Sequence, residues 1–336
     1  MKILTTGGLG VIGSYFATMM AYYGNQVTII DSAEEQRNHF IKDKLPKNIS
    51  VRVEKLETAN LNDISDYDLV LHAAAHTGIP HSIVDPNRDW TDNVDATKHL
   101  LDAIRLAKKA PNVVVLSSVK PYKTDNDCDL FGDRYVWKNK RTGFDETTEL
   151  EPDEPYAASK MAQSALCMAY ARSYNLPITV FRCSNLYGPA PSHGPRHGWL
   201  TWFCLSAALD RGIEVQGNGC QVRDMLFVTD ICSAVLLAHE HMPKLKGNVY
   251  NIGGGEKNSV SVKEAANIIK DILPRTTITY GEGRQHEDLI FITDYSRFYN
   301  ATGWVPQFSV KQGIGSILDW ALSNKKELQE AYFGVI

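Results

Sequence analysis

Short apolar runs alternate with amphipathic stretches along the first half of the chain. Three stretches with apolar positions three and four apart predict helices at 11–23, 88–109 and 156–174. Buried strands are predicted at the short apolar runs 2–6, 26–30, 51–54, 68–72, 112–116 and 177–181. Strands and helices in this alternation predict an α/β fold, a Rossmann-type doubly wound parallel sheet with helices on both faces.

The pattern changes after about residue 187, where prolines and glycines become frequent. We therefore predict a first domain at 1–186 and a smaller mixed lobe at 187–336, placed over the carboxyl ends of the sheet. Within the lobe, strands are predicted near 214, 224–228, 248–252 and 278–280, and helices at 199–211, 230–241, 262–273 and 310–323. The sequence leaves open whether the strand at 249–252 returns to the first domain. The polar segment 123–155 is predicted to be a long functional loop.

Composition excludes several classes of protein. The 336 residues carry a net charge of -4 and no basic block, which argues against binding to nucleic acid or to an anionic membrane. No apolar run reaches the roughly 18 residues of a membrane span, and no signal peptide is predicted. Six scattered cysteines indicate reduced thiols, so we expect a cytoplasmic protein. No metal is expected, because the spacing of five histidines fits no metal-ligand pattern: His72, His76, His81, His193 and His197.

A glycine-rich turn follows the first predicted strand. Gly7, Gly8, Gly10 and Gly13 satisfy two spacings typical of dinucleotide-binding turns, and a helix begins inside the turn. Glycines let the backbone approach a pyrophosphate, and the start of the helix offers free N–H groups to it. Asp31, at the end of the second strand, can accept hydrogen bonds from ribose hydroxyls and repels a 2′-phosphate. The sequence therefore predicts NAD rather than NADP as cofactor.

A tyrosine and a lysine lie four positions apart where the helix at 156–174 begins. Tyr156 and Lys160 share one helix face, and a nearby ammonium is expected to lower the pKa of the phenol. A phenol tuned in this way can move a proton to or from a sugar hydroxyl. Ser118 follows the strand at 112–116, at the sheet edge that faces the cofactor crevice, and its hydroxyl can bind the same oxygen. These three residues are the candidate catalytic set.

Motifs along nearly the whole chain resemble those of the extended short-chain dehydrogenase/reductase family, which comprises NAD-dependent epimerases and dehydratases. The resemblance is carried by the segments 6–13, 72–75, 93–97, 116–118, 156–160, 182–189, 217–224, 251–254 and 284–288. It implies an NAD-binding first domain and a second lobe that binds a nucleotide sugar. It also implies that Tyr156 is the redox base, that Lys160 binds the nicotinamide ribose, and that Ser118 holds the sugar hydroxyl.

Further residues carry expected roles. Asn185 and Arg223, with Arg284, resemble the residues that contact the substrate diphosphate, which suits the affinity of guanidinium groups for phosphate oxygens. The small residues at 73–75 let the backbone pass close to a flat ligand. The cofactor is expected to contact Gly7, Gly10, Val11, Ile12, Gly13, Asp31, Ala73, Ala74, Ala75, Asn93, Ser117, Tyr156 and Lys160.

Within the family the strongest resemblance is to enzymes that epimerise CDP-linked paratose or tyvelose at C2. The segments 134–135, 142–148 and 197–204 carry it, together with Lys120, which we include among the catalytic candidates. Dehydratases of the 4,6 type have an Asp-Glu pair where this chain has Val119 and Lys120. We therefore expect a nucleotide-sugar epimerase that oxidises and re-reduces one sugar carbon.

Three alternatives stay open at this point: 4-epimerisation, a non-standard dehydration on the same scaffold, and a non-catalytic NAD-binding protein. The intact set of Ser118, Tyr156 and Lys160 argues against the last of these. The helices at 88–109 and 156–174 carry more apolar surface than one covering face needs. Together with the resemblance, this surface predicts a homodimer or a higher homo-oligomer.

Overall fold

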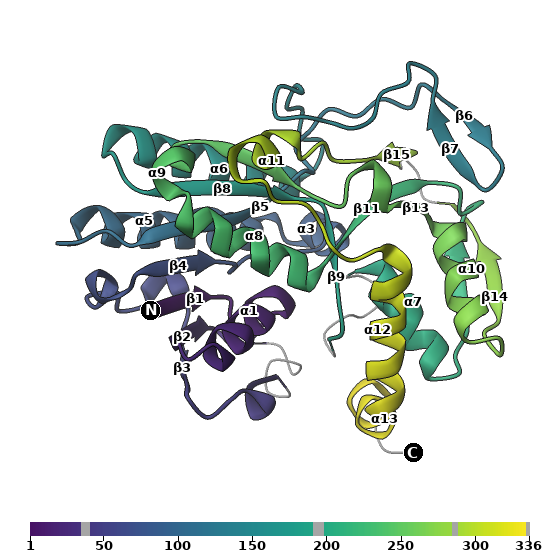
Figure 1. Cartoon of the computed structure of the whole chain (residues 1–336), viewed down its shortest axis with the longest axis horizontal. Coiled ribbons are helices and arrows are strands. Elements are labelled where there is room, and N and C mark those ends of the chain that lie inside the picture. Colours follow the sequence, from purple (N-terminus) through teal and green to yellow (C-terminus); the bar gives the residue numbers. More distant parts are fainter. Residues whose placement is uncertain (35–40, 191–197, 284–287, 334–336) are drawn as a thin grey trace.

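A computed structural model of the chain describes residues 1–34, 41–190, 198–283 and 288–333 (Figure 1). Its centre is a seven-stranded sheet in the order β3-β2-β1-β4-β5-β8-β12. All neighbouring pairs are parallel. The strands are β1 Lys2–Thr6, β2 Gln26–Asp31, β3 Ile49–Val53, β4 Leu69–His72, β5 Asn112–Ser118, β8 Ile178–Cys183 and β12 Val249–Ile252. The predicted fold class is therefore confirmed.

The strand order reverses between β1 and β4, and this reversal positions the site. The chain runs outward from β1 through β2 to β3, then returns to β4 on the other side of β1. Loops that leave the carboxyl ends of β1 and β4 consequently diverge and open a crevice. The glycine turn, Asp31 and residues 73–75 all follow strands at this edge.

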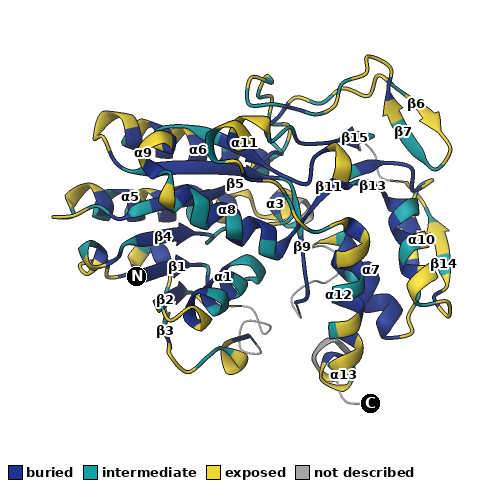
Figure 2. Cartoon of the chain, viewed as in Figure 1, coloured by how far each residue is buried: buried dark blue, intermediate teal, exposed yellow. Residues whose placement is uncertain are grey.

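Helices cover both faces of the sheet because side chains alternate along each buried strand. Ile3 packs into a core with α1 Val11–Tyr22 and α8 Val228–Glu240. The next residue, Leu4, packs into the opposite core with α5 Ala96–Leu106 and α6 Pro155–Ser173. Figure 2 shows the inner strands β1, β4, β5 and β8 as almost wholly buried, whereas only Ile49 is buried on the edge strand β3.

The long helix predicted at 88–109 is interrupted. It comprises α4 Pro86–Trp90, a π-helical turn at Thr91–Asp95 and then α5, and it follows the short helix α3 Ile79–Val84. A π-helical turn adds a residue to one turn of the helix and rotates the side chains around it. The π-helical turn contains Asn93, so it sets the direction of the side chain of this predicted cofactor residue.

The segment 123–155 contains a hairpin that the sequence prediction missed. Strands β6 Cys128–Phe131 and β7 Arg134–Trp137 pair antiparallel. Leu130 and Phe131 are exposed, so this short hairpin lacks the buried face that an alternating pattern reveals (Figure 2). The N–H of Tyr135 donates to the carbonyl of Cys220 at 3.0 Å, which ties the hairpin to the smaller part of the molecule.

The rest of the chain builds smaller sheets and helices beyond the strand ends (Figure 1). A four-stranded sheet contains β9 Asn185–Tyr187, β11 Val222–Phe227, β13 Ser259–Ser261 and β15 Ile290–Phe291, and a second sheet pairs β10 Ile213–Gln216 with β14 Ile278–Gly281. Helices here are α7 Trp199–Ala208, α10 Val262–Ile272, α12 Val310–Ser323 and α13 Lys325–Phe333. Helices α9 Met242–Leu245 and α11 Ser296–Thr302 pack instead into the core with α1 and α8, on one face of the large sheet. Three 3-10 turns complete the elements: η1 Leu56–Thr58, η2 Ile64–Asp66 and η4 Glu256–Asn258.

Several elements from beyond residue 187 join the large sheet or pack against it. Strand β12 pairs with β8, so the segment 249–252 does return to the first sheet. Helix α8 packs against α1 in the core on that face. The division of the chain at residue 187 stays a prediction.

Candidate active site

The glycine turn lies directly against the segment that follows β4. Gly7 has φ of +66°, and a Cβ on it would lie 2.5 Å from the backbone nitrogen of Ala74. A Cβ on Gly13 would overlap the carbonyl oxygen of Gly7. The N–H of Gly7 donates to the carbonyl of Ile30 at 2.8 Å. Only glycine allows both the left-handed conformation and this close approach, so the turn presents bare backbone to the crevice.

Asp31 holds the turn as well as facing the crevice. One carboxylate oxygen accepts the N–H of Leu9 at 2.9 Å, and the other accepts the N–H of Ala33 at 2.9 Å. A carboxylate offers about four acceptor positions, so these two bonds leave capacity for ribose hydroxyls. Asp31 therefore has a structural duty that the sequence did not reveal.

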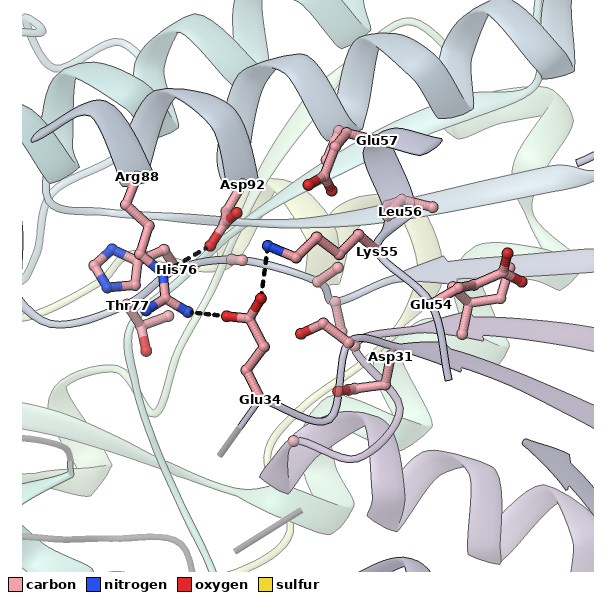
Figure 3. A pocket seen from close by; sticks show the side chains of 18 residues that line it. Asp31, Glu34, Glu54, Lys55, Leu56, Glu57, His76, Thr77, Arg88 and Asp92 are labelled. Carbon is pink, nitrogen blue, oxygen red and sulfur yellow. Dashed lines mark hydrogen bonds and ion pairs between the residues drawn. The ribbon is translucent and has the colours of Figure 1, made fainter. Parts of the chain in front are cut away.

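A pocket of about 870 Å³ of empty space, partly open to solvent, lies at this edge (Figure 3). Six predicted cofactor residues line it: Gly7, Gly10, Asp31, Ala73, Ala74 and Ala75. Charged side chains from the loops after β2 and β3, from η1, from α4 and from the π-helical turn complete the wall: Glu34, Glu54, Lys55, Glu57, Arg88 and Asp92. The pocket thus combines bare backbone at the glycine turn with a charged rim.

Other predicted cofactor residues have their side chains engaged with the protein. Val11 and Ile12 open α1 and pack against the apolar core next to α7 and α12. Asn93 is fully buried and clamps the backbone of His76, accepting its N–H at 2.8 Å and donating to its carbonyl at 3.2 Å. The Ser117 hydroxyl donates to the carbonyl of Lys160 at 3.1 Å. In the structure the side chains of Asn93 and Ser117 therefore position the crevice rather than face into it.

The three candidate catalytic residues meet where β5 ends against α6. The Ser118 side chain hydrogen-bonds the phenol of Tyr156, and its oxygen also accepts the N–H of Lys120 at 3.1 Å. Lys160 is 2% exposed, and its ammonium donates to the carbonyl of Leu116 at 2.9 Å. The N–H of Tyr156 donates to the Ser82 hydroxyl at 2.7 Å, which anchors the first turn of α6 to α3. The residues that the sequence separates by about 40 positions are thus brought together.

The expectation that Lys160 lowers the pKa of Tyr156 is wrong for this structure. Burial raises the pKa of Tyr156 to about 12, and the hydrogen bond from Ser118 opposes the rise. Burial also lowers the pKa of Lys160 to about 8. The physical reason is that desolvation favours the neutral form of both groups, while the ammonium is directed at the Leu116 carbonyl.

Lys120 faces the C-terminal part of the chain. Its ammonium lies 3.1 Å from a carboxylate oxygen of Asp288, and the side chains are 37% and 20% exposed. Thr124 donates to the other Asp288 oxygen at 2.5 Å. The positive charge of Lys120 contributes to a pKa of Asp288 below the ordinary range, against the opposing effect of burial. Lys120 therefore sits at the rim of the site in an ion pair with Asp288.

Glu154 is a site residue that the sequence analysis missed. It precedes the first turn of α6, yet its side chain makes no capping hydrogen bond. Within the described part of the chain its buried Oε1 has no hydrogen-bond partner. Burial raises the pKa of Glu154 to about 7, an effect that Lys120 opposes and that Asp153, Asp288 and Asp89 reinforce. Only the fold shows this carboxyl to be buried beside Tyr156, whose own pKa it helps to raise.

The predicted diphosphate contacts are described in part. Asn185 lies on β9 and donates to the carbonyl of Asp224 at 3.3 Å. Arg223 lies on the neighbouring strand β11, is partly exposed, and helps to lower the pKa of Asp288. Arg284 lies outside the described residues. Asn185 and Arg223 are therefore brought near the strand ends, on the side of Lys120 and Asp288.

Asp224, next to Arg223 in the sequence, is directed into the protein. It is fully buried and accepts hydrogen bonds from Ser184 at 2.7 Å and from the N–H of Gly255 at 3.2 Å. Burial raises its pKa, which these hydrogen bonds oppose. Asp224 thus fastens β11 to the loops after β8 and β12.

The histidine at the end of β4 is structural. Its ring nitrogens lie 2.7 Å from the hydroxyl of Thr6 and 2.8 Å from that of Thr97, and burial lowers the pKa of His72 to about 3. His76 lies 2.7 Å from a carboxylate oxygen of the buried Asp89.

Among the described residues no group of three or more potential ligands is placed to hold a metal. None of the described helices is both long and apolar enough to cross a membrane.

Together the fold and this site define a nucleotide-binding α/β protein with a tyrosine–lysine pair at the carboxyl edge of its sheet. A model of the NAD dependent epimerase/dehydratase family matches residues 3–253. The chain belongs to that family. The family resemblance seen in the motifs is therefore confirmed, and the chain is an enzyme of this family.

Two kinds of relative are similar along the whole chain. CDP-paratose 2-epimerase of Salmonella typhi is 30% identical over 340 residues, which span 96% of this chain and 100% of that protein. dTDP-glucose 4,6-dehydratase 1 of Escherichia coli K12 is 29% identical over 352 residues, which span 97% of this chain and 94% of that protein. Identities this close in value leave both epimerase and dehydratase chemistry within the family open for this chain.

Solved structures share the fold and name the cofactor. UDP-glucose 4-epimerase of Thermotoga maritima, solved with UDP-glucose, has a TM-score of 0.81 at 25% identity and covers 97% of this chain and 100% of that one. The dTDP-glucose 4,6-dehydratase DesIV of Streptomyces venezuelae, solved with NAD, has the same TM-score and identity over 98% and 100% of the two chains. NAD is the cofactor of this family, and the predicted cofactor is confirmed. The bare glycine turn and Asp31 at the pocket fit it.

We expect Gly13→Ala to lose bound NAD. Alanine favours a helix by up to about 1 kcal/mol over glycine, but its Cβ would overlap the Gly7 carbonyl and displace the turn. A backbone displacement that costs about 1–3 kcal/mol weakens NAD binding about 5- to 150-fold, so NAD content falls at limiting NAD. The matched control is Gly315→Ala on α12, where a Cβ meets open space. Nucleotide released from denatured protein reports the result, and equal NAD in both variants would contradict it.

Glu154 predicts a particular dependence of stability on pH. Its pKa is raised from 4.5 to about 7, so between these values the unfolded chain loses the proton that the folded chain keeps. Stability from this group is therefore present below about pH 4.5 and declines as pH rises to about 7. Glu154→Gln should gain stability relative to wild type by about 1–2 kcal/mol between pH 5 and pH 8, less than the full linkage value because the side chain is partly exposed.

Urea unfolding of wild type and Glu154→Gln at pH 5 and at pH 8 measures this difference in the free energy of unfolding. The control is Glu151→Gln, because that exposed carboxylate lies three residues away in the same loop and pairs with Lys123. Asp89, Asp153, Asp288 and Lys120 also act on Glu154, and they are present in wild type and variant alike. A pH dependence unchanged by Glu154→Gln would show that the carboxyl titrates normally.

Proposed function

We propose that this enzyme is a nucleotide-sugar epimerase that inverts one carbon of a CDP-linked sugar, at C2. The observation that carries the proposal is the cluster of Ser118, Tyr156 and Lys160 beside the cofactor crevice, with Lys120 next to Ser118. The similarity to CDP-paratose 2-epimerase supports the choice of substrate. NAD supplies a hydride acceptor that can return the same hydride, so the reaction has no net redox change.

Tyr156 and Ser118 handle the proton of the reacting hydroxyl. With a pKa of about 12 the phenol is protonated at neutral pH, so it can donate to a sugar carbonyl oxygen in the reducing half of the cycle. In the oxidising half the phenol must first lose its proton. Lys160 lies one helical turn away but directs its ammonium at the Leu116 carbonyl, so the charge that favours this loss has to come with cofactor and substrate. Ser118 orients the sugar oxygen, since its side chain already bonds the phenol.

Inversion at C2 needs no proton abstraction from carbon. In a 3,6-dideoxy sugar a ketone at C4 is two carbons from C2 and does not acidify the C2 proton. Oxidation at C2 itself, followed by hydride return to the other face, is therefore the simplest path. Val119 is buried and Lys120 is paired with Asp288, so neither supplies the acid and base that 4,6-elimination requires.

The substrate diphosphate is assigned to the smaller lobe. Asn185 and Arg223 lie on the adjacent strands β9 and β11, and Arg284 belongs to the same proposed set. Guanidinium groups bind phosphate oxygens through two parallel hydrogen bonds, which suits a dianionic linker in a half-closed crevice. Asp288 next to Arg223 and Lys120 limits the positive charge there, so the substrate competes with an internal carboxylate.

A second candidate, a non-standard dehydration, is favoured by Glu154. Its buried carboxyl has a pKa of about 7, and the positive charge of Lys120 opposes the rise in that pKa. A carboxyl with that pKa can exchange protons at neutral pH, as elimination of water requires. 4-Epimerisation on the same scaffold is the third candidate, and the similarity to a UDP-glucose 4-epimerase supports it.

Incubation with CDP-paratose, CDP-tyvelose, dTDP-glucose and UDP-glucose in deuterated water, followed by NMR, separates these candidates. C2 epimerisation predicts interconversion of the two CDP sugars without solvent deuterium at carbon. Deuterium in the product indicates a step through an enol, as in dehydration. Conversion of dTDP-glucose or UDP-glucose alone would overturn the C2 proposal.

Tyr156→Phe removes the proposed proton donor and acceptor. General acid–base groups contribute about 10²–10⁴-fold, so turnover is expected to fall by that range while NAD stays bound.

Lys120→Met should reduce turnover strongly if the lysine faces the substrate, with reduced cofactor trapped and visible by absorbance. The matched control is Lys123→Met, an exposed lysine of the same loop that pairs with Glu149 and Glu151. Equal rates for the two lysine variants would remove Lys120 from the catalytic set.

We also propose that two copies of the chain pair through α5 and α6. These helices contact each other on one face of the sheet. Large apolar side chains on or beside them remain exposed: Trp90 by 52%, Leu106 by 71% and Tyr174 by 51%. Light scattering at micromolar concentration should give the mass of a dimer or higher oligomer, and Trp90→Glu should shift it toward the monomer. A monomeric wild-type protein would refute the pairing.

A further inference from the structure

The adenosine end of the cofactor pocket holds more negative than positive charge. Its walls carry two cations, Lys55 and Arg88, and five carboxylates: Asp31, Glu34, Glu54, Glu57 and Asp92. NADP differs from NAD by a 2′-phosphate, which adds a charge of about -1.5 to -2 at neutral pH. Discrimination between the two cofactors therefore depends on which of these charges a 2′-phosphate can reach.

Glu34 engages both cations at once (Figure 3). One oxygen lies 2.7 Å from the ammonium of Lys55, and the other lies 2.8 Å from a guanidinium nitrogen of Arg88. The three residues come from separate elements: the loop after β2, the loop after β3 and α4. Lys55 lowers the pKa of Glu34, and Glu34 raises the pKa of Lys55, so the pair is ionised at neutral pH.

The two cations depend on Glu34 to different degrees. Arg88 has a second carboxylate partner, because its Nε lies 3.2 Å from Asp92. For Lys55 the hydrogen bond with Glu34 is the largest effect on its pKa, and Glu57 and Asp92 act only through weaker charge effects. Removal of the Glu34 charge is therefore expected to release Lys55 first.

Asp31 alone does not account for the choice of cofactor. Both of its oxygens already accept backbone N–H groups, from Leu9 and Ala33. A change at Asp31 consequently disturbs the glycine turn, and binding of NAD and NADP would fall together. In the described part of the chain, Glu34 does not hydrogen-bond the glycine turn. Its partners, Lys55 and Arg88, are the cations that would bind a 2′-phosphate.

We propose that Glu34 is a cofactor-specificity residue, which favours NAD over NADP by occupying Lys55 and Arg88. While the carboxylate holds both cations, a 2′-phosphate entering beside Asp31 meets paired charges and additional carboxylates. Without it, Lys55 becomes a phosphate ligand at the same end of the pocket. The assignment concerns cofactor choice and does not depend on which sugar the enzyme converts.

The test compares Glu34→Gln with wild type in an equimolar mixture of NAD and NADP. Protein is equilibrated with the mixture in excess and desalted, and the nucleotides released on denaturation are quantified. The ratio of bound NADP to NAD should rise about 5- to 30-fold, as expected when one or two partly exposed ion-pair cations become available to a phosphate. The matched control, Glu57→Gln, removes one carboxylate from the same pocket wall and should change the ratio less than about twofold.

Two further variants locate the effect. Glu34→Asp retains the charge and should retain most of the preference for NAD. The double variant Glu34→Gln with Lys55→Met should lose most of the NADP gain, because the released cation is gone. The proposal is wrong if Glu34→Gln weakens binding of both cofactors and leaves their ratio unchanged, or if its ratio matches that of Glu57→Gln. Glu34 would then only link the loops through its ion pairs. Thermal unfolding of each variant shows that the comparison is made on folded protein.

Discussion

The contact between the glycine turn and the segment after β4 is the constraint on which this structure depends. Gly7 lies so close to the backbone of Ala74 that no side chain fits between them. This contact brings together the loops that leave β1 and β4, the two strands between which the sheet order reverses. Asp31 draws the same turn toward β2 through the N–H of Leu9. The cofactor pocket is the space that these three loops enclose.

The candidate catalytic groups are positioned by a second contact, between β5 and α6. Ser117 bonds the carbonyl of Lys160 and lies 2.8 Å from the hydroxyl of Ser164, which sets the helix against the strand end. Ser118 then meets Tyr156, and Lys160 reaches the carbonyl of Leu116. The residues that point away from the cofactor thus decide where the catalytic side chains lie.

Burial gives the site its resting electrostatics. It raises the pKa of Tyr156 and Glu154 and lowers that of Lys160, so each group is driven toward its neutral form. His72 at the end of β4, whose pKa is lowered by burial and by the charge of Lys160, is held neutral between two threonine hydroxyls. The ionisation that sugar oxidation requires therefore has to come with cofactor and substrate.

Strand and helix periodicity, the glycine spacing and the Tyr156–Lys160 interval are local patterns. The first two were enough to predict the sheet and the cofactor, and the catalytic set that the third indicates stays a prediction. The π-helical turn at Asn93, the exposed hairpin at 128–137 and the burial of Glu154 have no comparable local signal. They arise from contacts between segments far apart in the chain. The same is true of the pairs Lys120–Asp288 and Glu34–Lys55, because a side chain's charge partner is set by which loops the sheet edge brings together.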